Sequence, residues 1–218
     1  MTKKISPLQK SLNLWALILI IWSIYRAKFH LPEWFDEFLA KPAVFILPVY
    51  LYIKNIEKKD FLSRVSLNKN NLKRDIFLSL FIGFLLIGAS LVSNFLKRGF
   101  FTIPSYLTNP YTFFYTLIIL LITALSEEIL SRGFILKRLY EDSQNIYSSS
   151  FFASILFFSL HIPIFFTNPT VSRNLLLLLM STNLILSLVN SFIFLDRKSL
   201  IVPILIHAFY NLAIIFYA

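Results

Sequence analysis

Four side chains able to take part in hydrolysis lie in the second half of this 218-residue chain: Glu127, His161, His207 and Asn211. A carboxylate can take a proton from water, and an imidazole can hold that water and relay the proton. A second imidazole and an amide can stabilise the oxyanion formed when water attacks a peptide carbonyl. The chain has no Cys, which excludes thiol nucleophiles and thiolate metal sites. These groups therefore predict peptide hydrolysis without a covalent intermediate and without a cofactor.

A zinc site is the alternative that the same residues allow. Two imidazoles and one carboxylate, here His161, His207 and Glu127, can bind zinc and leave a position for water. The HExxH spacing of many zinc proteases is absent. Residue types alone leave both chemistries open.

The two adjacent glutamates lie in an apolar segment, residues 111–138, that is long enough to cross a membrane. A charged side chain in hydrocarbon costs about 2.5 to 3.5 kcal/mol on insertion scales, so a span that keeps such residues needs a reason. Glu128 and Arg132 are four residues apart and are predicted to pair. Glu127 points about 100° away from Glu128 on a helix and is free to face a cavity.

The composition predicts a membrane protein, because 57% of the residues are hydrophobic and only 15% are charged. The apolar runs lack the alternation of barrel strands, so we expect helices. The predicted fold is a single all-α domain, residues 1–218, forming a polytopic membrane bundle of about seven transmembrane helices. Residues 1–110 hold three accessory spans, and 111–218 hold the predicted catalytic core. The predicted spans are about 11–25, 39–53, 76–96, 111–138, 146–166, 174–195 and 199–217.

Basic residues predict the direction of insertion, since cytoplasmic loops are enriched in Lys and Arg. The Lys and Arg residues are unevenly distributed among the connections. The segment from Lys54 to Arg74 alone holds seven of them. Placing this segment inside predicts a cytoplasmic amino terminus and an outer carboxyl terminus. The same rule accounts for the formal charge of +10, so no nucleic-acid partner is expected.

The predicted helices bring the polar residues to one depth. At a rise of about 1.5 Å per residue, Glu127 and His161 each lie about 20 Å from the connection between their helices. His207 and Asn211 lie roughly 13 and 20 Å beyond Lys198. We expect a shared polar cavity, because buried polar groups must satisfy one another. The ionisable residues assigned to the spans are Glu127, Glu128, Arg132, His161 and His207.

Pro163 lies two residues beyond His161. A proline has no N–H to donate to the carbonyl four residues earlier, here that of Ser159. We therefore expect it to end or kink the fifth span.

Three sequence patterns resemble the motifs of one protease family: Glu127-Glu128-x-x-x-Arg132, Phe157-x-x-x-His161 and His207-x-x-x-Asn211. They are similar to those of the CAAX protease and bacteriocin-processing family, also called the ABI family, which includes the Ras-converting CAAX protease. Gly133 follows Arg132, as is common in that family. The resemblance implies a bundle of membrane helices and an intramembrane protease.

The resemblance also implies a role for each matching residue. Glu127 and His161 would activate water, and His207 and Asn211 would form the oxyanion hole. Glu128 and Arg132 would support the site, and Phe157 would pack beneath His161. Family members have also been described as metalloproteases, so zinc stays an alternative.

The expected partners are the lipid bilayer and a peptide or membrane-associated protein substrate. The small size and the Lys-, Asn- and Ile-rich loops favour a bacterial cytoplasmic membrane. There the function would be maturation of a bacteriocin or pheromone, CAAX-type processing, or self-immunity. The alternatives are a non-catalytic immunity or binding protein, a polar network that only fixes helix packing, and a proton-coupled transporter.

Overall fold

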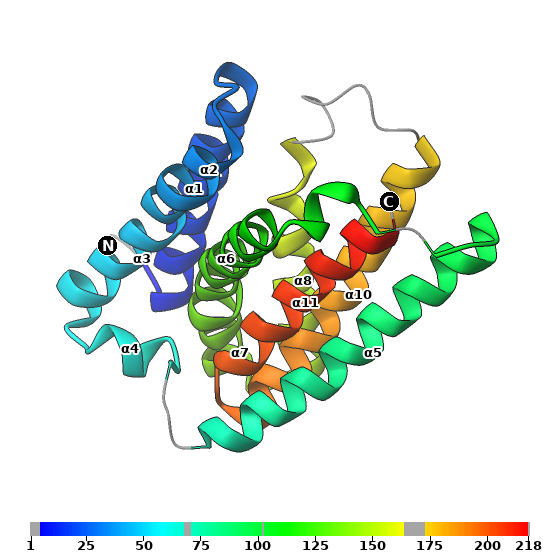
Figure 1. Ribbon diagram of the computed structural model, residues 1–218. Coiled ribbons are helices and arrows are strands. Elements are labelled where there is room, and N and C mark those ends of the chain that lie inside the picture. The colour runs from blue at the N-terminus through cyan, green and yellow to red at the C-terminus, as the bar shows by residue number, and fades with distance from the viewer. Residues whose placement is uncertain (1–4, 68–70, 102, 164–172, 218) are drawn as a thin grey trace.

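The computed structural model describes residues 5–67, 71–101, 103–163 and 173–217, which form helices and connections without a strand (Figure 1). Five helices in these ranges are long and apolar enough to cross a membrane, and α8 (Ile146–Ser159) and α11 (Ile201–Tyr217) are shorter apolar helices. The prediction of an all-α polytopic membrane protein is confirmed. The number of crossings and their direction stay predictions.

The described elements fall into two parts of the chain. The first comprises α1 (Pro7–Lys28), α2 (Glu33–Phe35), η1 (Asp36–Ala40), η2 (Pro42–Ile46), α3 (Leu47–Tyr52), η3 (Ile53–Glu57), α4 (Phe61–Arg64) and α5 (Leu72–Arg98). The second comprises η4 (Ser105–Thr108), α6 (Pro110–Glu128), η5 (Ile129–Leu136), α7 (Lys137–Ser143), α8, α10 (Arg173–Arg197) and α11. Of the η segments, η4 is a 3₁₀ turn and the others are π-helical.

The second membrane-length helix differs from the sequence prediction. We expected a connection over 29–41 and a span, interrupted by two prolines, over about 39–53. The structure instead continues one helical path from Glu33 to Glu57. Pro42 and Pro48 lie inside this path, at the starts of η2 and α3, and each removes one N–H from the helical hydrogen bonds. The π-helical turns around them absorb the change in hydrogen bonding.

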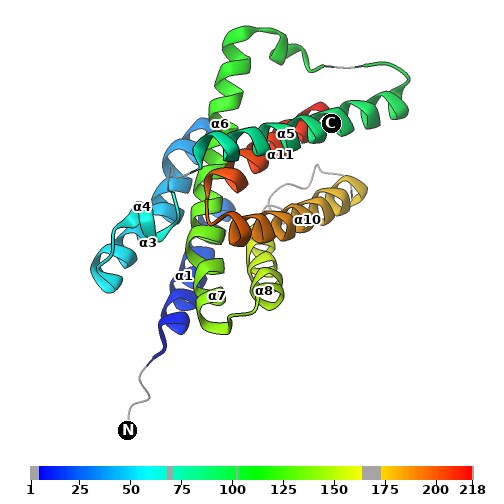
Figure 2. The same cartoon turned by 90° about the horizontal axis from the view of Figure 1, so that it is seen from below.

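The central element is the continuous helix formed by α6, η5 and α7, residues 110–143. Its start is fixed by Asn109, whose side chain accepts a hydrogen bond from the Tyr111 N–H at 2.9 Å. It ends at Gln144, which adopts a left-handed backbone conformation. Figure 2 shows this helix running between the amino-terminal helices on one side and α8 and α10 on the other.

The carboxyl-terminal helices pack as a layer on this central helix. α11 lies alongside α5 and also contacts α6 and α10, and α10 packs on α8 (Figures 1 and 2). Gly83 of α5 makes close approach to α11 possible, since a Cβ there would lie 2.3 Å from Cγ of Phe209. The Asn94 amide donates to the Phe216 carbonyl at 2.6 Å across the same interface.

Connections that the sequence assigns to the cytoplasmic side lie at one end of the bundle. Arg64, after the second helix, donates to the Glu141 carboxylate of α7 at 2.6 Å. The Leu200 N–H, before α11, donates to the Ser66 carbonyl at 2.9 Å. These contacts hold the connections together, and their placement on the cytoplasmic side stays a prediction.

The fifth predicted span is shorter than expected. α8 ends at Ser159, four residues before Pro163, and residues 164–166 of the predicted span lie outside the described residues. The chain turns here, with the Leu160 N–H donating to the Phe157 carbonyl at 3.1 Å. His161 is consequently on a turn at the helix end, not within a regular helix.

Replacing Gly83 by Ala should lower the thermal stability of the detergent-solubilised protein, because the new methyl group would force the Phe209 ring or the α5 backbone to move. Overpacking of this kind costs about 1 to 3 kcal/mol. Gly88→Ala on the same helix is the matched control, since a Cβ there meets nothing within 4 Å. Equal melting temperatures for the two variants would contradict the packing described for α5 and α11.

Candidate active site

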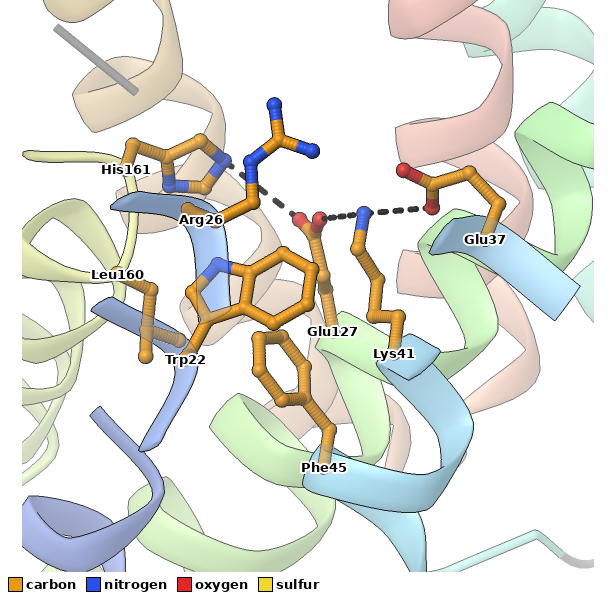
Figure 3. Close-up of a pocket in the computed structure, with 8 residues that line it drawn as sticks. All are labelled: Trp22, Arg26, Glu37, Lys41, Phe45, Glu127, Leu160 and His161. Atoms are coloured by element: carbon orange, nitrogen blue, oxygen red, sulfur yellow. Dashed lines mark hydrogen bonds and ion pairs between the residues drawn. The ribbon is translucent and has the colours of Figure 1, made fainter. Parts of the chain in front are cut away.

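Glu127 is the centre of the polar cluster inside the bundle. The residue, near the end of α6, is 7% exposed, and its two carboxylate oxygens have different surroundings. Oε1 accepts a hydrogen bond from Lys41 Nζ at 2.9 Å. Within the described part of the chain Oε2 has no hydrogen bond, and it lies 3.6 Å from Nε2 of His161 and 3.7 Å from Nε2 of His207. Figure 3 shows Lys41 and His161 approaching Glu127 from opposite sides.

The hydrogen bonds at Nδ1 of the two imidazoles determine whether each Nε2 faces Glu127 with a proton or with a lone pair. His161 Nδ1 lies 3.2 Å from the Phe157 carbonyl, which can only accept, so Nδ1 carries the proton. His207 Nδ1 lies 2.8 Å from Glu128 Oε1 and donates to that carboxylate. In their neutral forms both rings therefore turn the Nε2 lone pair towards Glu127. Three acceptors converge, an arrangement suited to a water molecule with two O–H groups.

Glu128 and Arg132 form a second, fully buried network behind this cluster. The predicted pair is present, with Arg132 Nη1 at 2.9 Å from Glu128 Oε1. Arg132 Nη2 also donates to the carbonyl and hydroxyl oxygens of Ser187, at 3.0 and 2.7 Å. The Asn190 amide donates to the same Glu128 oxygen at 3.3 Å. Glu128 is thus tied to α10 and, through His207, to α11.

Aromatic packing joins the two networks. The Phe157 ring lies 4.8 Å from the His161 ring, centroid to centroid, and 5.8 Å from the His207 ring. The Arg132 guanidinium carbon lies 4.5 Å from the same Phe157 ring, within cation–π range. Phe157 therefore occupies the position next to His161 that the sequence predicted.

The helix changes its winding at the glutamates. α6 ends at Glu128 and π-helical η5 follows, beginning with an Ile129 N–H directed at the carbonyls of both Leu125 and Ser126. Such turns are frequent at functional sites because they re-aim side chains without ending the helix. The turn lies directly after the residues that face the cavity.

Asn211 is a predicted site residue whose side chain makes no hydrogen bond to the Glu127 cluster in the described residues. It lies one helical turn beyond His207 on α11 and is half-buried. Within the described residues its side chain has no hydrogen-bond partner. Its amide is consequently unengaged, and its part in the site stays a prediction.

Lys41 and Glu37 are site residues that the sequence analysis missed. Lys41 is 5% exposed, and its Nζ lies 2.6 Å from Glu37 Oε2 as well as 2.9 Å from Glu127 Oε1. Thr123 of α6 also donates to Glu37, at 2.6 Å. The assignment of ionisable residues to the spans was therefore incomplete. The signal that could have found them is the four-residue spacing of Glu37 and Lys41, which allows an ion pair on one face of a helix.

A cavity of about 90 Å³ adjoins the Glu127 carboxylate and has room for several water molecules. Lys41, Glu37 and His161 line it together with Glu127. Trp22 and other residues of the amino-terminal helices close the remaining wall (Figure 3). The cavity thus lies between the two parts of the chain.

The described residues include no group of three or more His, Asp or Glu side chains arranged to hold a metal ion. Lys41 Nζ already places a positive charge beside Glu127. In this structure the ammonium group of Lys41 is therefore the cation that pairs with Glu127.

Comparison with known proteins gives one match. Residues 109–213 match the family described as type II CAAX prenyl endopeptidase Rce1-like. The chain matches no curated protein and no solved structure. The matched segment includes the predicted site residues Glu127, His161, His207 and Asn211. Lys41 lies outside it.

Replacing Arg132 by Met should destabilise the fold strongly, because Glu128 would keep a buried charge without its cation. Breaking a buried pair by removing one partner costs about 3 to 5 kcal/mol. Arg74→Met is the control, since Arg74 is exposed at the start of α5. Melting of both variants in detergent measures the effect, and an unchanged Arg132→Met variant would show that this network does not support the fold.

Proposed function

We propose that the chain is an intramembrane protease in which Glu127 activates water for direct attack on a peptide bond. The match of residues 109–213 to the Rce1-like family of CAAX endopeptidases supports a CAAX-type protease, and the residue roles are our proposal. The proposal rests on the different surroundings of the two Glu127 oxygens. Lys41 binds Oε1, while Oε2 faces the Nε2 atoms of two imidazoles.

In the proposed first step a water molecule lies between Glu127 Oε2 and His161 Nε2. Glu127 takes one proton from this water while the water oxygen attacks the carbonyl carbon of the substrate. The carbonyl oxygen then becomes an oxyanion. The amide of Asn211 is the proposed donor to that oxyanion. In the second step the C–N bond breaks and the proton passes from Glu127 to the leaving amine.

The geometry restricts how His207 can contribute. With Nδ1–H bonded to Glu128, a neutral His207 has only a lone pair at Nε2 and cannot donate to an oxyanion. We therefore propose that His207 stabilises the oxyanion in its protonated form, in which both ring nitrogens donate. In the neutral form it can instead accept a hydrogen bond from the attacking water.

We propose that hydrolysis is metal-independent, with zinc as the alternative. The support is the Lys41 ammonium group, which already provides the positive charge that Glu127 requires. A zinc enzyme would instead use Glu127, His161 and His207 as ligands, with the metal beside the Lys41 ammonium group.

The proposed substrate is a small peptide or a membrane-associated protein at a bacterial cytoplasmic membrane. A groove of about 660 Å³ between α5, α10 and α11 supports access from the bilayer. Tyr210 lines this groove, and its ring lies 6.5 Å from the His207 ring. Maturation of a bacteriocin or pheromone and self-immunity are the processes we favour.

Replacing Glu127 by Gln should abolish cleavage, because the amide keeps the shape of the side chain but cannot take a proton. The assay incubates detergent-solubilised protein with a peptide library and identifies products by mass spectrometry. Glu33→Gln, the same change at an exposed position, is the control and should cleave normally. Wild-type cleavage by Glu127→Gln would refute the assignment. Bacteriocin protection that persists in Glu127→Gln cells would favour the non-catalytic immunity protein.

Replacing Asn211 by Leu should lower kcat by about 10²- to 10³-fold, the usual loss for one oxyanion donor. KM should change little, because the donor acts when charge develops on the carbonyl oxygen. Steady-state kinetics on a peptide that the wild type cleaves distinguishes the two parameters. A higher KM at unchanged kcat would instead assign Asn211 to substrate binding.

A further inference from the structure

We infer that Lys41 is a positioning residue of this active site, which holds Glu127 by one oxygen and leaves the other to take a proton from water. The inference rests on the proposed function and extends it to a residue outside the matched family segment. It means that the amino-terminal helices complete the reaction centre.

The contacts of Lys41 are those of a fixed ammonium group. It is 5% exposed, and its Nζ is shared between Glu127 Oε1 at 2.9 Å and Glu37 Oε2 at 2.6 Å. Nζ lies 5.8 Å from the Trp22 ring centroid, within cation–π range. Figure 3 shows Lys41 between the two carboxylates. These contacts restrain rotation of the Glu127 carboxylate, so that Oε2 stays directed at the histidines.

The charge balance shows what this contact does during the reaction. Before attack, the Lys41 ammonium group is shared between the carboxylates of Glu127 and Glu37. When Glu127 becomes protonated, its negative charge moves to the oxyanion, and Lys41 keeps only Glu37 as a charged partner. Inside the bundle the attraction of the ammonium group for the new anion is larger than in bulk water. Lys41 therefore stabilises the transition state without exchanging a proton.

Glu37 keeps Lys41 in place throughout this cycle. It is anchored by Thr123 of α6 and retains its charge when Glu127 is neutralised. Glu37 and Lys41 are one helical turn apart, which aligns both side chains towards α6. Without Glu37, Lys41 would have a single carboxylate partner, and that partner is the one that reacts.

The test uses the full chain in detergent with a peptide that the wild type cleaves. Lys41→Met removes the ammonium but leaves Glu37 and Glu127 buried without their cation. The double variant Lys41→Met with Glu37→Gln also removes one of these charges, and it decides the question if the single variant does not fold. Lys41→Arg retains the charge, and Lys54→Met is the matched control at an exposed lysine of the same helix.

We expect kcat to fall by about 10²-fold in the double variant, as for a misplaced or unstabilised reacting group. KM should stay near the wild-type value, because Lys41 does not touch the substrate. Lys41→Arg should recover most of the lost turnover, whereas a purely structural lysine would show no such dependence of kcat on charge. Lys54→Met should behave as wild type.

A folded double variant with wild-type kcat, in an enzyme that Glu127→Gln inactivates, would overturn this inference alone. A loss confined to KM would overturn it too, because Lys41 would then act in binding. If neither the wild type nor any variant cleaves peptides, the proposed function fails and this inference fails with it.

Discussion

Two neighbouring carboxylates inside a membrane bundle each require a cation, and the rest of this structure depends on how that requirement is met. Glu127 and Glu128 diverge on their helix, so one cation cannot serve both. Lys41 pairs with the first and Arg132 with the second. One of these cations comes from the amino-terminal helices and the other from the helix that bears the glutamates.

This separation gives the two carboxylates different surroundings. Glu128 is completely buried, and one of its oxygens accepts from Arg132, His207 and Asn190. That network holds α6, α10 and α11 together and orients the His207 ring. Glu127 has only one oxygen engaged and adjoins a cavity. Glu128 thus acts as a structural anchor, whereas Glu127 is the proposed base.

The sequence predicted much of this arrangement because membrane burial makes each polar residue costly and hence informative. Glu127, His161 and His207 meet as the depth estimate indicated, and Glu128 pairs with Arg132. Except for His161, which lies on a turn, these residues are on segments whose helical character was clear from their apolar runs.

Other features depend on information that spacing does not contain. Lys41 was assigned to a connection of mixed charge, and the π-helical turns that continue the helix through Pro42 leave no mark in the residue pattern. His207 donates from Nδ1 because that nitrogen lies next to Glu128, which is on another helix. The early end of α8 places His161 on a turn, which a proline two residues later does not specify.

The central claim is that a lysine-held carboxylate, and not a metal ion, activates the water. The most direct measurement is the cleavage rate of the wild-type protein after exhaustive chelation, with the bound metal determined by elemental analysis of the same sample. Our account predicts an undiminished rate in protein that carries almost no metal. Activity that disappears on chelation and returns in proportion to added zinc would contradict it, and would make Glu127 and the two histidines metal ligands.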